Sequence, residues 1–225
     1  MPTIYVIAGP NGIGKTTSSF DLLPKNVPLI NSDEIAKEAR EAGIISLNSQ
    51  EYSNQEATKL VNDHLDKHSS FIIETNLADV ETWKFLISVQ QLGYELNVKY
   101  ISTDRLDLLN SRIAERVLLG DHYVRPDIVE QRYITGLKLL DHYFAYPDVL
   151  ELFDNSKTML LVAEYRKGQP VMELEKLPSW IVDYLGRHLS GAVASDISQR
   201  AHKDIDEVRK TYQILKNRTT GDQGK

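Results

Sequence analysis

The stretch VIAGPNGIGKTTSSF, residues 6–20, constrains the fold more than any other part of the chain. A short β-branched run ends at Gly9, and Gly14, Lys15 and Thr16 follow after four intervening residues, which matches the pattern G-x-x-x-x-G-K-[ST] without a mismatch. Glycines in such a loop let consecutive backbone N–H groups turn inward around phosphate oxygens. The sequence therefore predicts a phosphate-binding loop (Walker A) between a strand and a helix.

The parts of this loop have distinct expected roles. We expect Lys15 to place its ammonium on the β and γ phosphates and Thr16 to bind Mg²⁺ through its hydroxyl. The helix that starts near Gly14 would direct the positive end of its dipole at the anion. The predicted ligand is ATP or GTP, and the predicted ATP-binding residues are Gly9, Pro10, Asn11, Gly12, Ile13, Gly14, Lys15, Thr16 and Thr17.

Strand-like and helix-like stretches alternate after the loop. Strands separated by helices of this length need crossover connections, so the sheet should be mainly parallel, with helices on both faces. This is an α/β P-loop domain. Beyond the first strand and the loop helix, we predict strands at 27–33, 69–75, 94–103 and 158–165, and helices at 34–43, 53–68, 80–93 and 105–119.

Composition narrows the classes of partner. At 225 residues and 41% hydrophobic, the chain can bury the core of one domain with an appendage. A net charge of −6 gives no general attraction to nucleic acid or to an anionic membrane, so nucleic acid is an unlikely partner. The absence of cysteine excludes disulfides, thiol catalysis and thiolate metal sites. With no apolar run of membrane-span length and no basic leader, we expect a cytoplasmic protein.

We divide the chain into a kinase-like domain at 1–188, a linker with a C-terminal helix at 189–216, and a disordered tail at 217–225. An amphipathic pattern supports the C-terminal helix, which would pack on its own domain or form a dimer or partner surface. Its apolar positions are Ile197, Ala201, Ile205, Val208, Tyr212 and Leu215.

Two acidic residues follow the predicted second and third strands. In open α/β sheets, ligands lie outside the carboxyl ends of the strands, so Asp33 and Glu74 should both face the γ-phosphate. Asp33 is placed to take the proton from an acceptor hydroxyl, or it caps the helix that we expect to start at Glu34. Glu74 either holds Mg²⁺ through water or binds the acceptor.

Arginines cluster in the segment 105–132, which we interpret as a flap. If 105–119 is helical, Arg105, Arg112 and Arg116 lie within roughly 40° of one another around the helix axis. Arg125 follows in a loop after a glycine helix break, and the next helix carries Arg132. Such arginines can supply positive charge to a phosphoryl transition state, or they form a solvated, salt-bridged face.

Nucleotide binding alone does not separate a kinase from a GTPase switch or a motor ATPase. A switch normally carries an N-K-x-D motif that reads guanine, and this chain has none. A motor usually ends a strand in Asp for the metal, whereas the strand FIIET ends in Glu74 and Thr75. These features favour a kinase.

Five segments in this order resemble the zeta toxin family of P-loop kinases, especially its compact bacterial members. The resemblance spans about residues 3–188 and implies an adenylate-kinase-like core with a five-stranded parallel sheet. The segments are AGPNGIGKTT, INSDEIA, FIIETNL, RIAERVLLGDHYVRPDIVEQRY and LFDNS.

The resemblance implies a function and a set of roles. ATP would donate its γ-phosphate to a hydroxyl of a sugar nucleotide such as UDP-N-acetylglucosamine, and an antitoxin protein would be a partner. It makes Lys15 the phosphate clamp, Asp33 the base, and Arg116 and Arg125 the phosphate-facing arginines. The implied substrate contacts are Asp33, Glu74, Thr75 and Asn76.

The chain also departs from the family. Thr75, Asn76 and Leu77 follow Glu74 where the toxin-type motif has a Gly-Thr pair, and the flap is shorter. Both departures concern the acceptor side of the site. We therefore keep two alternatives: a kinase of another metabolite or of a nucleic-acid end, and a nucleotide-dependent protein-binding module in which hydrolysis is incidental.

Overall fold

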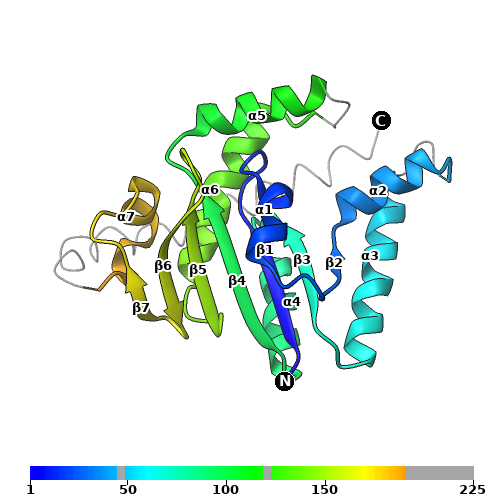
Figure 1. Cartoon of the computed structure of the whole chain (residues 1–225), viewed down its shortest axis with the longest axis horizontal. Coiled ribbons are helices and arrows are strands. Elements are labelled where there is room, and N and C mark those ends of the chain that lie inside the picture. Colours follow the sequence, from blue (N-terminus) through cyan, green and yellow to red (C-terminus); the bar gives the residue numbers. More distant parts are fainter. Residues whose placement is uncertain (45–48, 119–122, 191–225) are drawn as a thin grey trace, which may run out of the picture.

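The computed structural model describes residues 1–44, 49–118 and 123–190. It contains a seven-stranded sheet flanked by helices (Figure 1). The C-terminal helix and tail predicted beyond residue 190 lie outside the described residues, as does the part of the flap at 119–122. The strands are β1 (Thr3–Ala8), β2 (Leu29–Ile30), β3 (Phe71–Thr75), β4 (Glu95–Ser102), β5 (Val149–Asp154), β6 (Leu160–Arg166) and β7 (Gln169–Glu173).

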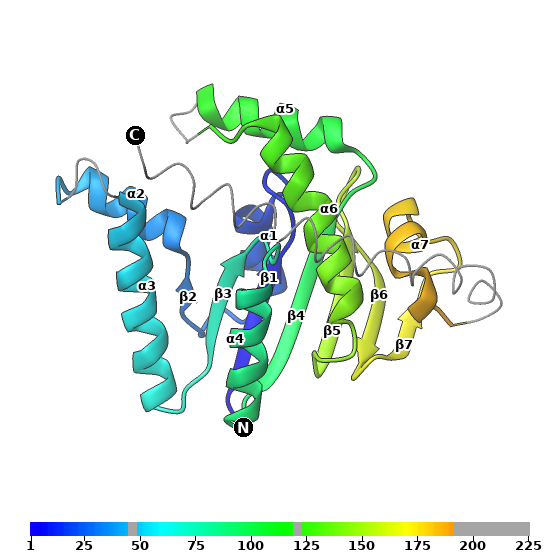
Figure 2. The ribbon, with the colours of Figure 1, turned by 180° about the vertical axis from the view of Figure 1, so that it is seen from behind.

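The helices lie on both faces of this sheet and across one edge. Helices α4 and α6 cover one face, and α1 packs on the other (Figures 1 and 2). Helix α5 crosses the edge at which the parallel strands end. The helices are α1 (Lys15–Leu22), α2 (Ser32–Glu41), α3 (Ser49–Asp66), α4 (Val80–Gln91), α5 (Leu106–Leu118), α6 (Pro126–His142) and α7 (Ser179–Leu185), followed by the 3₁₀ turn η1 (Gly186–His188). Within the described ranges, no helix combines the length and the apolar character that a membrane span needs.

The sheet order is β2-β3-β1-β4-β5-β6-β7. The pairs from β2 to β5 are parallel, which confirms the predicted α/β class and the parallel core. The sheet nevertheless has seven strands rather than five, because β6 and β7 extend it by antiparallel pairing. The order places the P-loop strand β1 at the centre of the five parallel strands, between β3 and β4.

The identity of the fifth parallel strand was wrong in the prediction. We expected it at 158–165, but that segment is β6 and runs antiparallel to its neighbour. The fifth parallel strand is β5, where we predicted no strand, although the LFDNS segment begins within it. Residues 155–159 alone join the two strands, and a parallel pair needs a crossover of a dozen residues or more. A short connection therefore requires an antiparallel hairpin.

A second hairpin joins β6 to β7. Lys167 and Gly168 form its turn, with φ angles of 48° and 74°. Two consecutive residues with positive φ are typical of a type I′ turn, whose twist matches that of antiparallel strands. We did not predict this hairpin, although the glycine of the Lys-Gly pair suits a turn with positive φ.

The core fixes the sheet against α4 and α6. Leu96, Val98 and Tyr100 point from β4 to the same face, and each is fully buried. Trp83 of α4 and Leu137 of α6 are also fully buried and belong to the same core cluster. Burial on this scale, at about 25 cal/mol per Å² of apolar surface, holds the carboxyl ends of β1, β3 and β4 in fixed register.

Helix α2 begins earlier than predicted. Asn31 is its N-cap, and the Asn31 side chain accepts hydrogen bonds from the backbone amides of Asp33 (2.9 Å) and Glu34 (3.4 Å). Asp33 therefore lies in the first helical turn, and the alternative in which it caps the helix is wrong. Its carboxylate is left for other partners, although a negative charge here also suits the helix dipole.

Candidate nucleotide and phosphoryl-transfer site

The predicted P-loop connects β1 to α1 and is tightly enclosed. Gly9, Gly12 and Gly14 have φ angles of 138°, 78° and 95°. A Cβ atom at Gly9 would lie 2.1 Å from the carbonyl oxygen of Ile101, and one at Gly12 would lie 2.6 Å from that of Leu109. The loop therefore needs glycine both for backbone conformation and for close approach to β4 and α5.

Lys15 points back into the loop and is 8% exposed. Its ammonium donates hydrogen bonds to the backbone carbonyls of Gly9 (2.9 Å) and Pro10 (3.2 Å) and to Oδ1 of Asn76 (3.1 Å). Burial lowers the pKa of Lys15 to about 8, although the charges of Glu74 and Asp33 oppose that shift. The loop thus holds a desolvated cation where the sequence predicts the phosphates.

Thr16 and Glu74 meet at the carboxyl ends of β1 and β3. The Thr16 hydroxyl lies 3.1 Å from both carboxylate oxygens of Glu74, and Nδ2 of Asn31 donates to Oε2 at 3.1 Å. Burial raises the pKa of Glu74, while the Lys15 charge and the Thr16 hydrogen bond lower it. Glu74 is therefore a partly buried carboxylate that contacts the predicted metal ligand.

This pair fits Mg²⁺. Mg²⁺ prefers oxygen ligands and is usually held by one or two protein groups, with waters and substrate phosphates completing its coordination. Thr16 and Glu74 offer a hydroxyl and a carboxylate at one point. Among the described residues there is no group of three His, Cys, Asp or Glu side chains that could hold a metal by itself. A metal here would therefore depend on the nucleotide phosphates.

Asp33 and Arg116 line the same small pocket beside the loop. They share it with Asn11 of the loop and with Ile113 and Val124 from the flap. The charges of Asp33 and Arg116 both act on Lys15. The structure thus brings together a carboxylate from α2, a guanidinium from α5 and the P-loop.

Three further side chains hold the outer side of the loop. Arg112 of α5 and Asn155 both donate to the carbonyl oxygen of Ile13, at 3.4 and 2.8 Å. Arg132 of α6 donates to Oδ1 of Asn11 at 2.9 Å. The flap helices are therefore attached directly to the P-loop.

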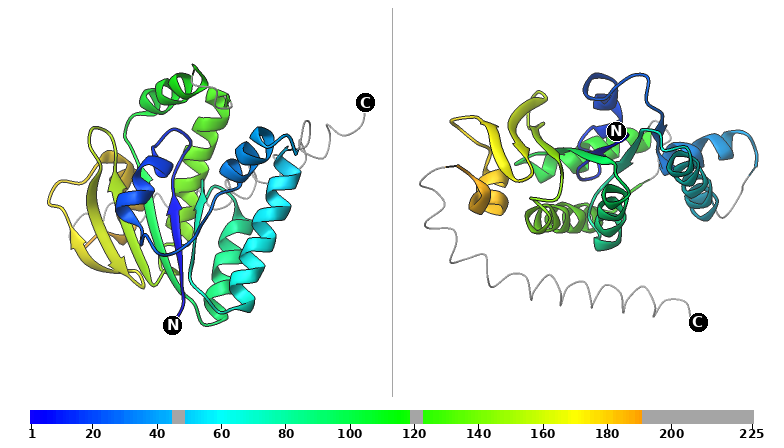
Figure 3. Two further views of the ribbon diagram at one scale, coloured as in Figure 1. Left: turned by 45° about the vertical axis from the view of Figure 1, so that its right-hand side comes forward. Right: turned by 90° about the horizontal axis from the view of Figure 1, so that it is seen from below.

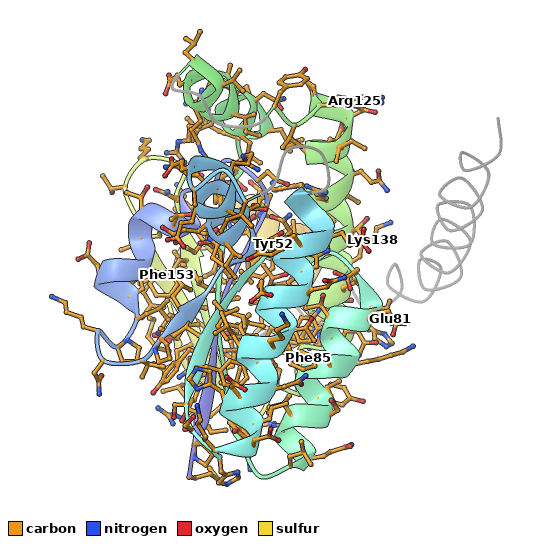
Figure 4. All side chains as sticks on the ribbon, turned by 90° about the vertical axis from the view of Figure 1, so that its right-hand side faces the viewer. Tyr52, Glu81, Phe85, Arg125, Lys138 and Phe153 are labelled. Carbon is orange, nitrogen blue, oxygen red and sulfur yellow. The ribbon has the colours of Figure 1, made fainter. Side chains whose placement is uncertain are left out.

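Two of the flap arginines point elsewhere. Arg125 precedes α6 and forms a two-point ion pair with Asp127, at 3.0 and 2.6 Å, with its side chain 69% exposed. Figure 4 shows Arg125 at the outer end of α6. Arg105 pairs in the same way with Asp107 and is 56% exposed. Of the arginines that the sequence places on the flap, Arg112 and Arg116 therefore lie near the loop, whereas Arg105 and Arg125 pair with local aspartates.

The other predicted site residues occupy the loop and the end of β3. Thr17 is exposed in the first turn of α1, and the Ile13 amide donates to the Pro10 carbonyl at 3.3 Å. The Thr75 hydroxyl accepts from the amide of Leu77 at 3.0 Å, so it stabilises the turn after β3.

We did not predict the contacts of three asparagines, which are Asn31, Asn76 and Asn155. Asn155 follows β5, so a correct placement of that strand would have put it at the carboxyl edge beside the loop. Asn31 precedes a helix and has the residue type preferred for an N-cap.

Comparisons with known proteins agree with this architecture. No protein-family profile matches the chain. An uncharacterized protein of Haemophilus influenzae is 27% identical over 128 residues, which cover 56% of this chain and 88% of that protein.

Among solved structures, a chain of the AvrRxo1-ORF1:ORF2 complex, crystallised with ATP, superposes with a TM-score of 0.63. It is 16% identical, and the match covers 93% of this chain and 76% of that one. A chain of the PezAT chromosomal toxin–antitoxin system of Streptococcus pneumoniae gives a TM-score of 0.50 at 19% identity, covering 92% and 87%. The chain therefore shares the fold of these two proteins. The similarity seen in five short segments of sequence is thus accompanied by structural matches that cover more than nine-tenths of the chain.

Proposed function

We propose that the protein is an ATP-dependent phosphotransferase that moves the γ-phosphate of ATP to a hydroxyl group of a small molecule. The observation that carries this proposal is the convergence of a buried P-loop lysine, a hydroxyl–carboxylate pair suited to Mg²⁺ and a separate carboxylate, Asp33, on one edge of the sheet. A chain of similar fold has been crystallised with ATP, which supports ATP as the donor.

Each group has a chemical task in this proposal. Gly9, Gly12 and Gly14 let the backbone surround the phosphates, and Lys15 neutralises charge on the β and γ groups. Thr16 and Glu74 would hold Mg²⁺, which when bound offsets phosphate charge. These groups bind ATP whether or not an acceptor is present.

Asp33 would act on the acceptor. Its carboxylate takes the proton of the acceptor hydroxyl while the hydroxyl oxygen forms a bond to the γ-phosphorus. The bond between that phosphorus and the bridging oxygen to the β-phosphate breaks, and ADP leaves with the electron pair. Arg116, which lines the same pocket as Asp33, would stabilise the charge on the transferred group.

We propose a sugar nucleotide such as UDP-N-acetylglucosamine as the acceptor, on the strength of the resemblance to the zeta toxin family. The PezAT neighbour comes from a toxin–antitoxin system, which supports an antitoxin as a protein partner. Arg125 would contribute in this scheme by leaving Asp127 when the flap meets the nucleotide phosphates.

Mass spectrometry of a metabolite extract incubated with the protein, ATP and Mg²⁺ tests the proposal. We expect one species to gain one phosphate with wild-type protein and not with Lys15→Ala. Purified UDP-N-acetylglucosamine and an oligonucleotide with a 5′-hydroxyl, run separately, identify the acceptor class. ADP released at the same rate with and without the extract would instead favour the nucleotide-dependent binding module.

A further inference from the structure

The turn that follows β3 is held in an unusual conformation. Leu77 has a φ angle of 53°, and its side chain is completely buried. A non-glycine residue seldom adopts this left-handed conformation, and such strain persists only where the surroundings impose it. Here the surroundings include the core around Leu77 and the hydrogen bond from its amide to the Thr75 hydroxyl.

Helix α6 approaches the same turn from the other side. Gly136 of α6 has no side chain, and a Cβ atom there would lie 2.7 Å from the Tyr100 hydroxyl and 3.5 Å from the carbonyl oxygen of Asn76. The backbone of Asn76 thus lies between the buried side chain of Leu77 and Gly136 of α6. This fixes the direction in which the Asn76 side chain leaves the turn.

That side chain reaches Lys15. Asn76 Oδ1 is one of three oxygens that accept a hydrogen bond from the Lys15 ammonium, and the other two are the loop carbonyls of Gly9 and Pro10. An ammonium has three protons, so these acceptors use its full donor capacity. All three are neutral, and Asn76 is the one that does not belong to the loop.

A stronger competitor for Lys15 lies two residues before Asn76. Glu74 acts on Lys15 through its charge, but its carboxylate oxygens are bonded to Thr16 and Asn31. A carboxylate is a better partner for an ammonium than an amide oxygen is, because both groups are charged. If Lys15 moved to Glu74, the loop would lose its cation.

We propose that Asn76 is a positioning residue that holds the Lys15 ammonium against the loop carbonyls and away from Glu74, and that a nucleotide phosphate oxygen takes the place of its amide oxygen when ATP binds. This inference rests on the proposed nucleotide-binding function of the loop. It gives Asn76 a role on the ATP side of the site, in addition to the acceptor contact that the family resemblance implies.

The test measures ATP affinity in EDTA, without Mg²⁺, so that any metal role of Glu74 does not contribute. Asn76→Ala removes the neutral acceptor and lets Lys15 pair with Glu74. We expect ATP binding to weaken about tenfold, because ATP must then break one hydrogen bond between charged groups. Adding Glu74→Gln to this variant removes the competing carboxylate, and we expect affinity to return to within about threefold of that of Glu74→Gln alone. A purely structural role of Asn76 would not be rescued in this way.

Asn76→Asp keeps the shape of the side chain and supplies a charged acceptor. We expect it to weaken ATP binding about a hundredfold, because the carboxylate retains Lys15 and repels the triphosphate. Since this variant is isosteric, it also serves if Asn76→Ala does not fold. Asn97→Ala on β4 is the matched control and should bind ATP as the wild type does, because the Asn97 side-chain oxygen is buried without a hydrogen-bond partner among the described residues.

Wild-type affinity in both Asn76 variants would overturn the inference, and so would a loss in Asn76→Ala that Glu74→Gln leaves unchanged. In either case the proposed function would stand if wild-type protein binds ATP and Lys15→Ala does not. Wild-type protein that fails to bind ATP would overturn both.

Discussion

The charged side chains on the inner side of the P-loop and those on the flap that crosses it differ in burial and in hydrogen bonding. On the inner side, Lys15 is buried and Glu74 is half-buried, and both are hydrogen-bonded to other groups of the site. On the flap, Arg105 and Arg125 are exposed and paired with aspartates two residues further along the chain. The inner side is therefore preorganised, whereas the outer part of the flap would have to exchange ion pairs to act.

This difference has an energetic basis. Exposed ion pairs are worth about 0–1 kcal/mol, so an arginine on the flap can leave its aspartate at little cost. Buried groups such as Lys15 carry a desolvation penalty that only well-placed partners offset. We therefore expect substitutions on the inner side to cost far more activity than substitutions on the outer flap.

Among the substitutions considered below, Asp33→Asn should cause the largest loss of phosphate transfer. If Asp33 is the base, phosphate transfer should fall by roughly 10²- to 10⁴-fold, while ATP affinity stays within a few fold. Because Asn31 provides the cap, the melting temperature should hardly change. Rates and affinities at two Mg²⁺ concentrations decide the role. A defect relieved by high Mg²⁺ would make Asp33 a metal ligand, and unchanged transfer would remove it from the mechanism.

Gly12→Ala should separate the loop from the flap. A Cβ atom would lie 2.6 Å from the Leu109 carbonyl at a φ of 78°, so α5 must move or the loop must distort. We expect transfer to fall about tenfold and the free energy of unfolding to fall by about 1–3 kcal/mol. Gly43→Ala is the matched control, since Gly43 has a φ of 68° and nothing within 4 Å of its Cβ position. Equal losses in the two variants would mean that backbone strain, and not contact with α5, is responsible.

The pH dependence of ATP binding should report the buried state of Lys15. Its pKa is lowered to about 8, so the ammonium loses its proton above pH 8 and ATP binding must then take one up. Affinity measured without Mg²⁺ should be constant below about pH 7.5 and then weaken by up to about tenfold per pH unit. Lys15→Met should bind weakly at every pH and show no such slope. The same slope in Lys15→Met would assign it to another group.

The smallest effect should come from the outer flap. With Asp127 as its present partner, Arg125→Ala should lower transfer by no more than about threefold. Arg116→Ala, from the pocket that also holds Asp33, should lower it by about tenfold or more. Steady-state rates with saturating ATP compare the two. Equal losses would show that Arg125, once it has left Asp127, stabilises the transition state as strongly as Arg116 does.

Much of the site could be predicted because it follows from rules that act along the chain. The spacing of Gly9, Gly14 and Lys15 defines the loop, and strand ends place Asp33 and Glu74 at the same edge. The negative charges of Asp33 and Glu74 both raise the pKa of Lys15, which agrees with their predicted position beside the loop.

Other features of the structure depend on contacts that the sequence pattern alone does not specify. The apolar runs of β5 and β6 look alike, and only the short connection between them decides which one is parallel. Helical periodicity places Arg105 beside Arg112 and Arg116, and Arg125 follows in a loop, but a local aspartate pairs with Arg105 and another with Arg125. Asn76 reaches Lys15 because of a strained turn and a close helix, which exist only after the chain has folded (Figure 3 shows the packing of the helices around the sheet).

The most direct test of the account compares wild-type protein with Lys15→Ala, each incubated with Mg²⁺, a metabolite extract and ATP labelled at the γ-phosphate. The measurement is the label found in organic phosphate as against inorganic phosphate. We expect the wild type to place label on a hydroxyl-bearing acceptor and Lys15→Ala to place none. Label released only as inorganic phosphate, or transfer by Lys15→Ala at a near-normal rate, would contradict it.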